Sequence, residues 1–179
     1  MKNSLIRNIS ISALCIALCY TLPFITGQVP QINSIFSPMH LPVLLCGIIC
    51  GPLYALTVGI VSPIFRSLTL TMPPMFPTAV AMAFELAAYG FFSGLIHKKL
   101  KKNTKIKDFW AICISLISAM VLGRIVWGLV TALISGLNGT GITLGAFFST
   151  VFIQGFPGMI CQLVLIPLLI FALKKAKII

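Results

Sequence analysis

Acidic residues are almost absent from this chain. Its 179 residues include two acids, Glu85 and Asp108, against thirteen lysines and arginines, and the formal net charge is +11. Charged residues make up 8% of the chain and hydrophobic residues 59%. So little charge excludes an ordinary soluble domain, in which about a quarter of the residues are charged. The sequence therefore indicates an integral membrane protein with no additional soluble domain.

Motifs for several kinds of chemistry are also missing. The sequence has no G-x-x-x-x-G-K-[ST] phosphate loop, so we expect no ATP hydrolysis. Cys15 with Cys19, and Cys46 with Cys50, have helical spacing suited to packing, and no cysteine spacing resembles a zinc motif. The basic charge is concentrated at helix ends, without an aromatic stacking platform for nucleic acid. We therefore expect no cofactor, no metal and no nucleic acid.

The basic residues that are present define the expected topology. Six lie between Lys98 and Lys107, and most of the others lie near the two ends of the chain. Lysine and arginine are retained on the cytoplasmic side of spanning helices, which predicts that this loop and both termini share that side. Spans of about 20 residues leave room for roughly six. We predict an all-α integral membrane protein, a six-transmembrane-helix bundle with both termini cytoplasmic and residues 1–179 forming a single domain.

The apolar segments place these helices. We expect helices near residues 5–22, 39–50, 53–70, 78–97, 109–135 and 144–173. The second is short, because Gly51-Pro52 ends it after about 18 Å at 1.5 Å per residue, and it should begin below the outer surface. Residues 23–38 are expected to form an external loop, and residues 33–40 are a candidate cavity wall.

Polar residues within the expected spans are few. Glu85 should lie about 10 Å below the outer end of its helix, at a depth shared with Arg124, Gln154 and Arg66. Because an unpaired charge in hydrocarbon is costly, these side chains should face the interior of the bundle. Two interpretations stay open: a polar chamber open to the outside, or a structural Glu85–Arg124 pair joining two helices. Two arginines against one acid would suit an anionic or carboxylate-bearing solute.

Rings and amides complete the candidate site. The candidate substrate-binding residues are Asn33, His40, Arg66, Glu85, Tyr89, Arg124, Trp127, Asn138 and Gln154. Taken alone, His40 is more often a packing or capping residue than a ligand. A function of a different class, a small intramembrane enzyme such as a lipid hydrolase or protease with Glu85 as base, lacks a nucleophile motif and a paired acid or histidine. We therefore predict that the chain is not an enzyme.

The first expected helix carries a pair of small residues. Ala13 and Ala17 lie one turn apart, a spacing that lets another helix approach closely. The spacing alone fits either packing within this bundle or docking to a partner subunit.

Four segments resemble the substrate-binding S components of energy-coupling factor (ECF) vitamin importers. They are FSPMHLPVLLCGIICGP at 36–52, GIVSPIFR at 59–66, MPPMFPTA at 72–79 and ELAAYG at 85–90. The resemblance covers nearly the whole chain, and PMHLPV, MPPMFPTA and ELAAYG look most like the pantothenate branch. Folate, riboflavin and pyridoxine are the alternative substrate classes.

The resemblance implies a transport function. It implies a six-helix bundle in a bacterial plasma membrane that binds its vitamin near the outer face, beneath the first external loop. Transport by this ABC-type importer would require a transmembrane T subunit and two ATPase subunits, with Ala13 and Ala17 as the docking surface for the T subunit. The string Met-His-Leu-Pro is also similar to the metal-binding start of cobalt and nickel S components. Because Met39 is internal here, the free amine ligand is lacking and a metal is not expected.

Overall fold

The computed structural model describes residues 2–25, 38–102, 107–137 and 156–176, and these segments are helical without any strand. The elements are α1 (Lys2–Ile25), α3 (His40–Cys50), α4 (Pro52–Leu70), the π-helical turn η1 (Met75–Ala79), α5 (Val80–Lys101), α6 (Asp108–Leu137) and α8 (Phe156–Lys175). Five helices are long and apolar enough to cross a membrane, and α3 is a shorter apolar helix. The predicted all-α membrane bundle is confirmed.

The break between α3 and α4 lies where the sequence predicts it. Gly51 has φ 100°, which a residue with a side chain rarely adopts, and Pro52 occupies the first turn of α4. The 11 residues of α3 cover about 17 Å, so the helix crosses little more than half of a hydrocarbon core. At its other end α4 stops at Thr71, a left-handed residue whose N–H donates to the Ser67 carbonyl at 3.0 Å.

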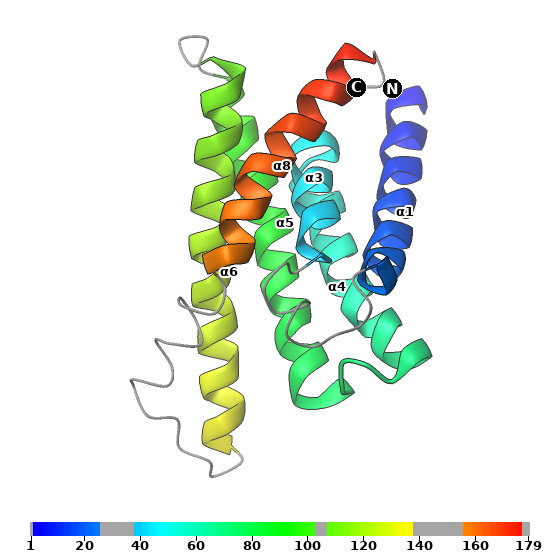
Figure 1. The fold of residues 1–179 in the computed structure, drawn as a ribbon, viewed down its shortest axis with the longest axis vertical. Helices are drawn as coiled ribbons and strands as arrows, with labels where there is room; N and C mark the ends of the chain where they lie inside the picture. The colour runs from blue at the N-terminus through cyan, green and yellow to red at the C-terminus, as the bar shows by residue number, and fades with distance from the viewer. Residues whose placement is uncertain (1, 26–37, 103–106, 138–155, 177–179) are drawn as a thin grey trace.

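Helix α5 contacts α3, α4 and α6 and organises the bundle (Figure 1). Glycines bring the backbones together. A Cβ on Gly59 would lie 2.5 Å from the Leu86 backbone, and one on Gly90 would lie 2.6 Å from the Ala55 carbonyl oxygen. Helices α4 and α5 are therefore in backbone contact along two turns, which fixes their relative register.

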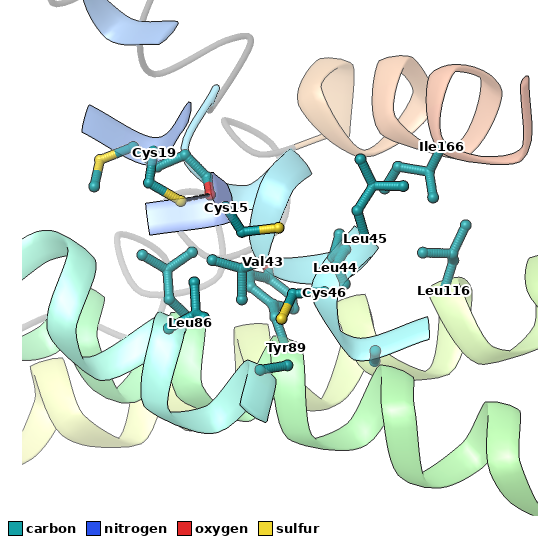
Figure 2. Packing of buried hydrophobic residues seen from close by; sticks show 14 of the residues in the cluster. Cys15, Cys19, Val43, Leu44, Leu45, Cys46, Leu86, Tyr89, Leu116 and Ile166 are labelled. Atoms are coloured by element: carbon teal, nitrogen blue, oxygen red, sulfur yellow. Dashed lines mark hydrogen bonds between the residues drawn. The ribbon is translucent and has the colours of Figure 1, made fainter. Parts of the chain in front are cut away.

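The buried apolar core is centred on α3. Figure 2 shows Val43 and Leu44 of α3 between Cys15 of α1 and Tyr89 of α5, and both α3 residues are fully buried. The thiol of Cys19 donates to the Met39 carbonyl at 3.4 Å. All six cysteines are free, and the described residues contain no group of three ligands able to hold a metal. The buried thiols act here as small packing groups.

Helix α1 has two distinct faces. Ser12, Cys15 and Cys19 are buried against the bundle. Ala13 and Ala17 are exposed on the side of α1 that faces away from it. Within the described part of the chain, this alanine pair is not used for internal packing.

The basic residues gather at one end of the bundle, as the charge distribution predicts. The Lys174 ammonium lies 2.6 Å from an Asp108 carboxylate oxygen, which joins the end of α8 to the start of α6. The beginning of α1 lies at the same end as the end of α8 (Figure 1). This is the charge arrangement of a cytoplasmic face.

The predicted helix boundaries hold within a few residues for α1, α3, α4 and α6. Helix α5 continues to Lys101, four residues beyond the expected end, because the lysine-rich sequence extends the helix out of the apolar span. The last helix was expected to begin at Leu144. In the structure α8 begins at Phe156, and the residues immediately before it lie outside the described segments.

Candidate functional site

Three ionisable side chains from three helices meet inside the bundle, two of them buried and the third, Arg124, largely buried. Glu85 of α5 is 3% exposed, and its Oε1 lies 3.5 Å from Arg124 Nη1 of α6 and 3.5 Å from His40 Nε2 of α3. The His40 ring contacts Tyr89 edge-on, with ring centroids 5.0 Å apart. We call His40, Glu85, Tyr89 and Arg124 the polar cluster. All four were among the candidate substrate-binding residues, and His40 gives Glu85 the neighbouring histidine that the sequence did not indicate.

Helix packing explains why these four residues meet. Tyr89 follows Glu85 by one turn on α5, so both lie on the same face. A Cβ on Gly123 would lie 2.5 Å from the Tyr89 ring, so this glycine lets α6 approach and brings Arg124 beside Glu85. His40 is the first residue of α3. Because α3 is short, its first residue lies inside the bundle, at the depth of Glu85.

The two ion pairs within the polar cluster are loose. The two 3.5 Å separations exceed the roughly 2.7–2.9 Å of a charge-assisted hydrogen bond. Among the described residues, Glu85 Oε1, Arg124 Nε and both His40 nitrogens are buried without a hydrogen-bond partner. Leaving such groups unsatisfied costs about 1–3 kcal/mol each, more when they are charged. The cluster thus presents both donors and an acceptor with unused hydrogen-bonding capacity.

The polar face of α6 continues outward from Arg124. Trp127 lies one turn further along and is half-buried. Thr131 follows another turn on, and its Oγ1 is buried without a partner in the described part of the chain. Sequence analysis missed Thr131, although its spacing of seven residues from Arg124 places it on the same helix face.

Arg66 does not join the polar cluster. Its Nε donates to the Met72 carbonyl at 3.2 Å, and its guanidinium lies 5.8 Å from the centre of the Phe24 ring. Gly59 packs at the level of Leu86, so Arg66, seven residues further along α4, lies about 10 Å outside that level. The expectation that Arg66 shares the depth of Glu85 is wrong, because the contact of α4 with α5 sets a different register.

Three candidates cannot be placed in this arrangement. Asn33, Asn138 and Gln154 lie outside the described residues. Trp127 lies one turn from Arg124 on α6 and is half-buried.

A family comparison decides the identity of this bundle. Residues 7–179 match the family described as ECF transporter, substrate-specific component. The chain belongs to this family. As an ECF S component it is a transport subunit and not an enzyme, which removes the intramembrane hydrolase or protease from consideration. S components work with ECF T and ATPase modules.

No curated protein and no solved structure matches the chain. The family match therefore establishes a substrate-specific transport subunit without naming its substrate.

Proposed function

We propose that this S component captures a small anionic vitamin, pantothenate, from the outer side of a bacterial plasma membrane. It then delivers the vitamin together with a T subunit and two ATPase subunits. The polar cluster would form the inner part of the vitamin site, and Trp127 and Thr131 would line the path toward the outer face.

The observation that carries this proposal is the unused hydrogen-bonding capacity of buried groups on three helices. A pair that served only to join helices would gain most from short, fully hydrogen-bonded geometry. Here Glu85 is 3.5 Å from both partners, and its Oε1, like Arg124 Nε, has no partner among the described residues. Side chains that point inward with spare donors and acceptors are typical of a small-molecule site.

The balance of charge shapes the choice of ligand. Glu85 already offsets Arg124, and Arg66 lies outside the cluster, so the described site is less positive than two arginines against one acid suggest. Pantothenate carries a carboxylate together with hydroxyl and amide groups. Arg124 and His40 offer donors for the carboxylate, and Glu85 offers an acceptor for a hydroxyl or an amide N–H. Asn33, Asn138 and Gln154 are proposed as further contacts from the surrounding segments.

The partner surface is proposed on α1. Ala13 and Ala17 are exposed while the opposite face of the same helix is buried, so they are free for a helix from outside the bundle. Small residues allow the close backbone approach on which helix association in lipid depends. We assign this surface to the T subunit.

A vitamin panel tests the proposed substrate. Purified protein would be mixed with radiolabelled pantothenate, folate, riboflavin and pyridoxine in turn, and retained label would be measured by filter binding. Saturable binding of pantothenate alone, displaced by unlabelled pantothenate, is expected. Saturable binding of another vitamin without pantothenate binding would keep the S-component function and overturn the substrate.

A further inference from the structure

A pocket of about 380 Å³ opens at the basic end of the bundle, where α3, α4 and α5 meet. Its lining includes Gly51, Leu53, Tyr54, His97, Lys98 and Lys101, and we call it the basic-end pocket. Lys98 follows Glu85 by thirteen residues on α5, about 20 Å along the helix. The pocket is therefore separate from the polar cluster and lies at the opposite end of the bundle.

Three glycines, Gly47, Gly51 and Gly94, line part of the basic-end pocket, so backbone forms part of its wall. A Cβ on Gly94 would lie 2.6 Å from the Pro52 nitrogen, so α5 contacts the turn between α3 and α4 directly. Helix α4 begins at this wall with no side-chain cap. The first N–H groups of a helix have no intrahelical acceptor, and the positive end of its dipole favours an anion. Leu53 and Tyr54, which line the pocket, are the first residues of α4 with such N–H groups.

The strongly polar side chains of the pocket lining include hydrogen-bond donors. Lys98 and Lys101 supply ammonium groups and Tyr54 a phenol. His97 also lines the pocket, but it is 8% exposed and its imidazole hydrogen-bonds to the Ala111 backbone, so it supplies no further donor. No acid is among the described residues that line the pocket. The helix end, the lysines and the phenol all favour an oxyanion rich in acceptors, such as a phosphate.

The apolar part of the lining indicates where such a phosphate comes from. Leu53 is 70% exposed and Ile48 is half-buried, and both lie on the pocket beside the lysines. This places an apolar side chain next to a cationic one at the end of the spanning helices, where lipid headgroups lie. We propose that the basic-end pocket binds the headgroup phosphate of an anionic phospholipid of the cytoplasmic leaflet, with an acyl chain along Leu53.

Lipid titration followed by native mass spectrometry tests this site. The detergent-purified protein would be titrated with phosphatidylglycerol and, separately, with phosphatidylcholine. The test variant is Lys98→Gln with Lys101→Gln, and the matched control is Lys107→Gln with Lys175→Gln, which removes the same charge at the same end outside the pocket. Two lysines near a membrane surface correspond to an affinity loss of about 30-fold for phosphatidylglycerol in the test variant. The control should retain the affinity of the unmodified protein.

The other outcomes separate the alternatives. Equal loss in the test and control variants would mean diffuse attraction to a basic surface and would overturn the site. Competition by inorganic phosphate alone as strong as by phosphatidylglycerol would overturn the lipid assignment. Unchanged lipid binding with loss of T-subunit co-purification would make the pocket a protein contact and overturn the proposal. If the double variant does not fold, Tyr54→Phe should still weaken phosphatidylglycerol binding, and unchanged binding would count against the site.

Discussion

The Glu85 side chain must both be charge-compensated inside the membrane and keep an oxygen free to accept a hydrogen bond from the proposed ligand. A carboxylate in the apolar part of a membrane needs a nearby cation, and Arg124 supplies it at 3.5 Å. The same carboxylate keeps its Oε1 without a hydrogen bond among the described residues. Removing one partner of a buried pair leaves the other uncompensated and costs about 3–5 kcal/mol of stability. Variants of this pair must therefore be measured for folding as well as for binding.

Arg124→Gln tests the residue that we assign to the vitamin carboxylate. The change removes a charge-assisted contact of about 1.5–3 kcal/mol, so pantothenate affinity should fall at least about tenfold. Equilibrium binding to purified protein measures the change. Full affinity in the glutamine variant would remove Arg124 from the site.

Two further variants accompany Arg124→Gln. Glu85→Gln would be compared for folded yield by size-exclusion chromatography, and loss of yield in both variants would favour a purely structural pair. Arg66→Gln is the matched arginine outside the polar cluster, since its guanidinium contacts Met72 and Phe24. It should weaken binding less than Arg124→Gln, and the reverse order would contradict the placement of the site.

Helices in this bundle are set against one another by glycines. Gly59 and Gly90 bring α4 against α5, and Gly123 brings α6 against Tyr89. Each contact fixes which residues of two helices share a level. The convergence of His40, Glu85 and Arg124 depends on these contacts and not on any single helix.

Gly90→Ala tests this glycine packing. The new Cβ would lie 2.6 Å from the Ala55 carbonyl oxygen, and the forced separation of α4 and α5 should cost about 1–3 kcal/mol. Thermal unfolding in detergent should show a lower midpoint. Gly136→Ala is the control, because a Cβ there meets nothing within 4 Å. An equal loss in both variants would mean that helix packing is not the cause.

Leucine substitutions at Ala13 and Ala17 test the face assigned to the T subunit. Ala13→Leu with Ala17→Leu adds bulk to an exposed face of α1, so the bundle should fold and bind vitamin. The wider helix separation should abolish co-purification with the T subunit and ATP-dependent uptake in vesicles. Ala132→Leu with Ala172→Leu adds the same bulk at exposed positions of α6 and α8 and should leave uptake intact. Normal uptake by the α1 variant would refute the assignment.

Periodicity and composition predicted the individual helices but not their relative placement. The Gly51-Pro52 break and the short α3 follow from local chemistry, and the charge cost of Glu85 predicts that it faces the interior, where it lies 3.5 Å from Arg124. The depth of Arg66 could not be predicted from the sequence, because it depends on which turn of α5 packs against Gly59. Thr131 was overlooked because one hydroxyl in an apolar helix carries no distinctive signal.

The whole molecule is asymmetric across the membrane. Exposed lysines such as Lys102, Lys107 and Lys175 lie at one end, whereas the polar cluster faces the half in which α3 begins. This asymmetry predicts how the protein sits in the bilayer, with the lysines in the cytoplasm.

Limited proteolysis tests that orientation. Trypsin should cleave at the exposed lysines in inside-out vesicles and leave the protein intact in right-side-out vesicles. Arg66 is buried and should resist cleavage in either preparation. Detergent-solubilised protein serves as the control that the lysine sites are cleavable. Cleavage in sealed right-side-out vesicles would reverse the predicted topology.

The glycine contacts between the polar cluster and the basic end also restrict where a bound molecule can leave. Gly90 and Gly94 place α5 directly against the backbones of α4 and of the turn between α3 and α4. Side chains can change rotamer to open a passage between helices. Two helix backbones in direct contact have no side chain between them that could move in this way. Along this interface an exit toward the basic end requires whole helices to separate. Release along this interface toward the basic end would then need energy from outside the bundle to separate these helices.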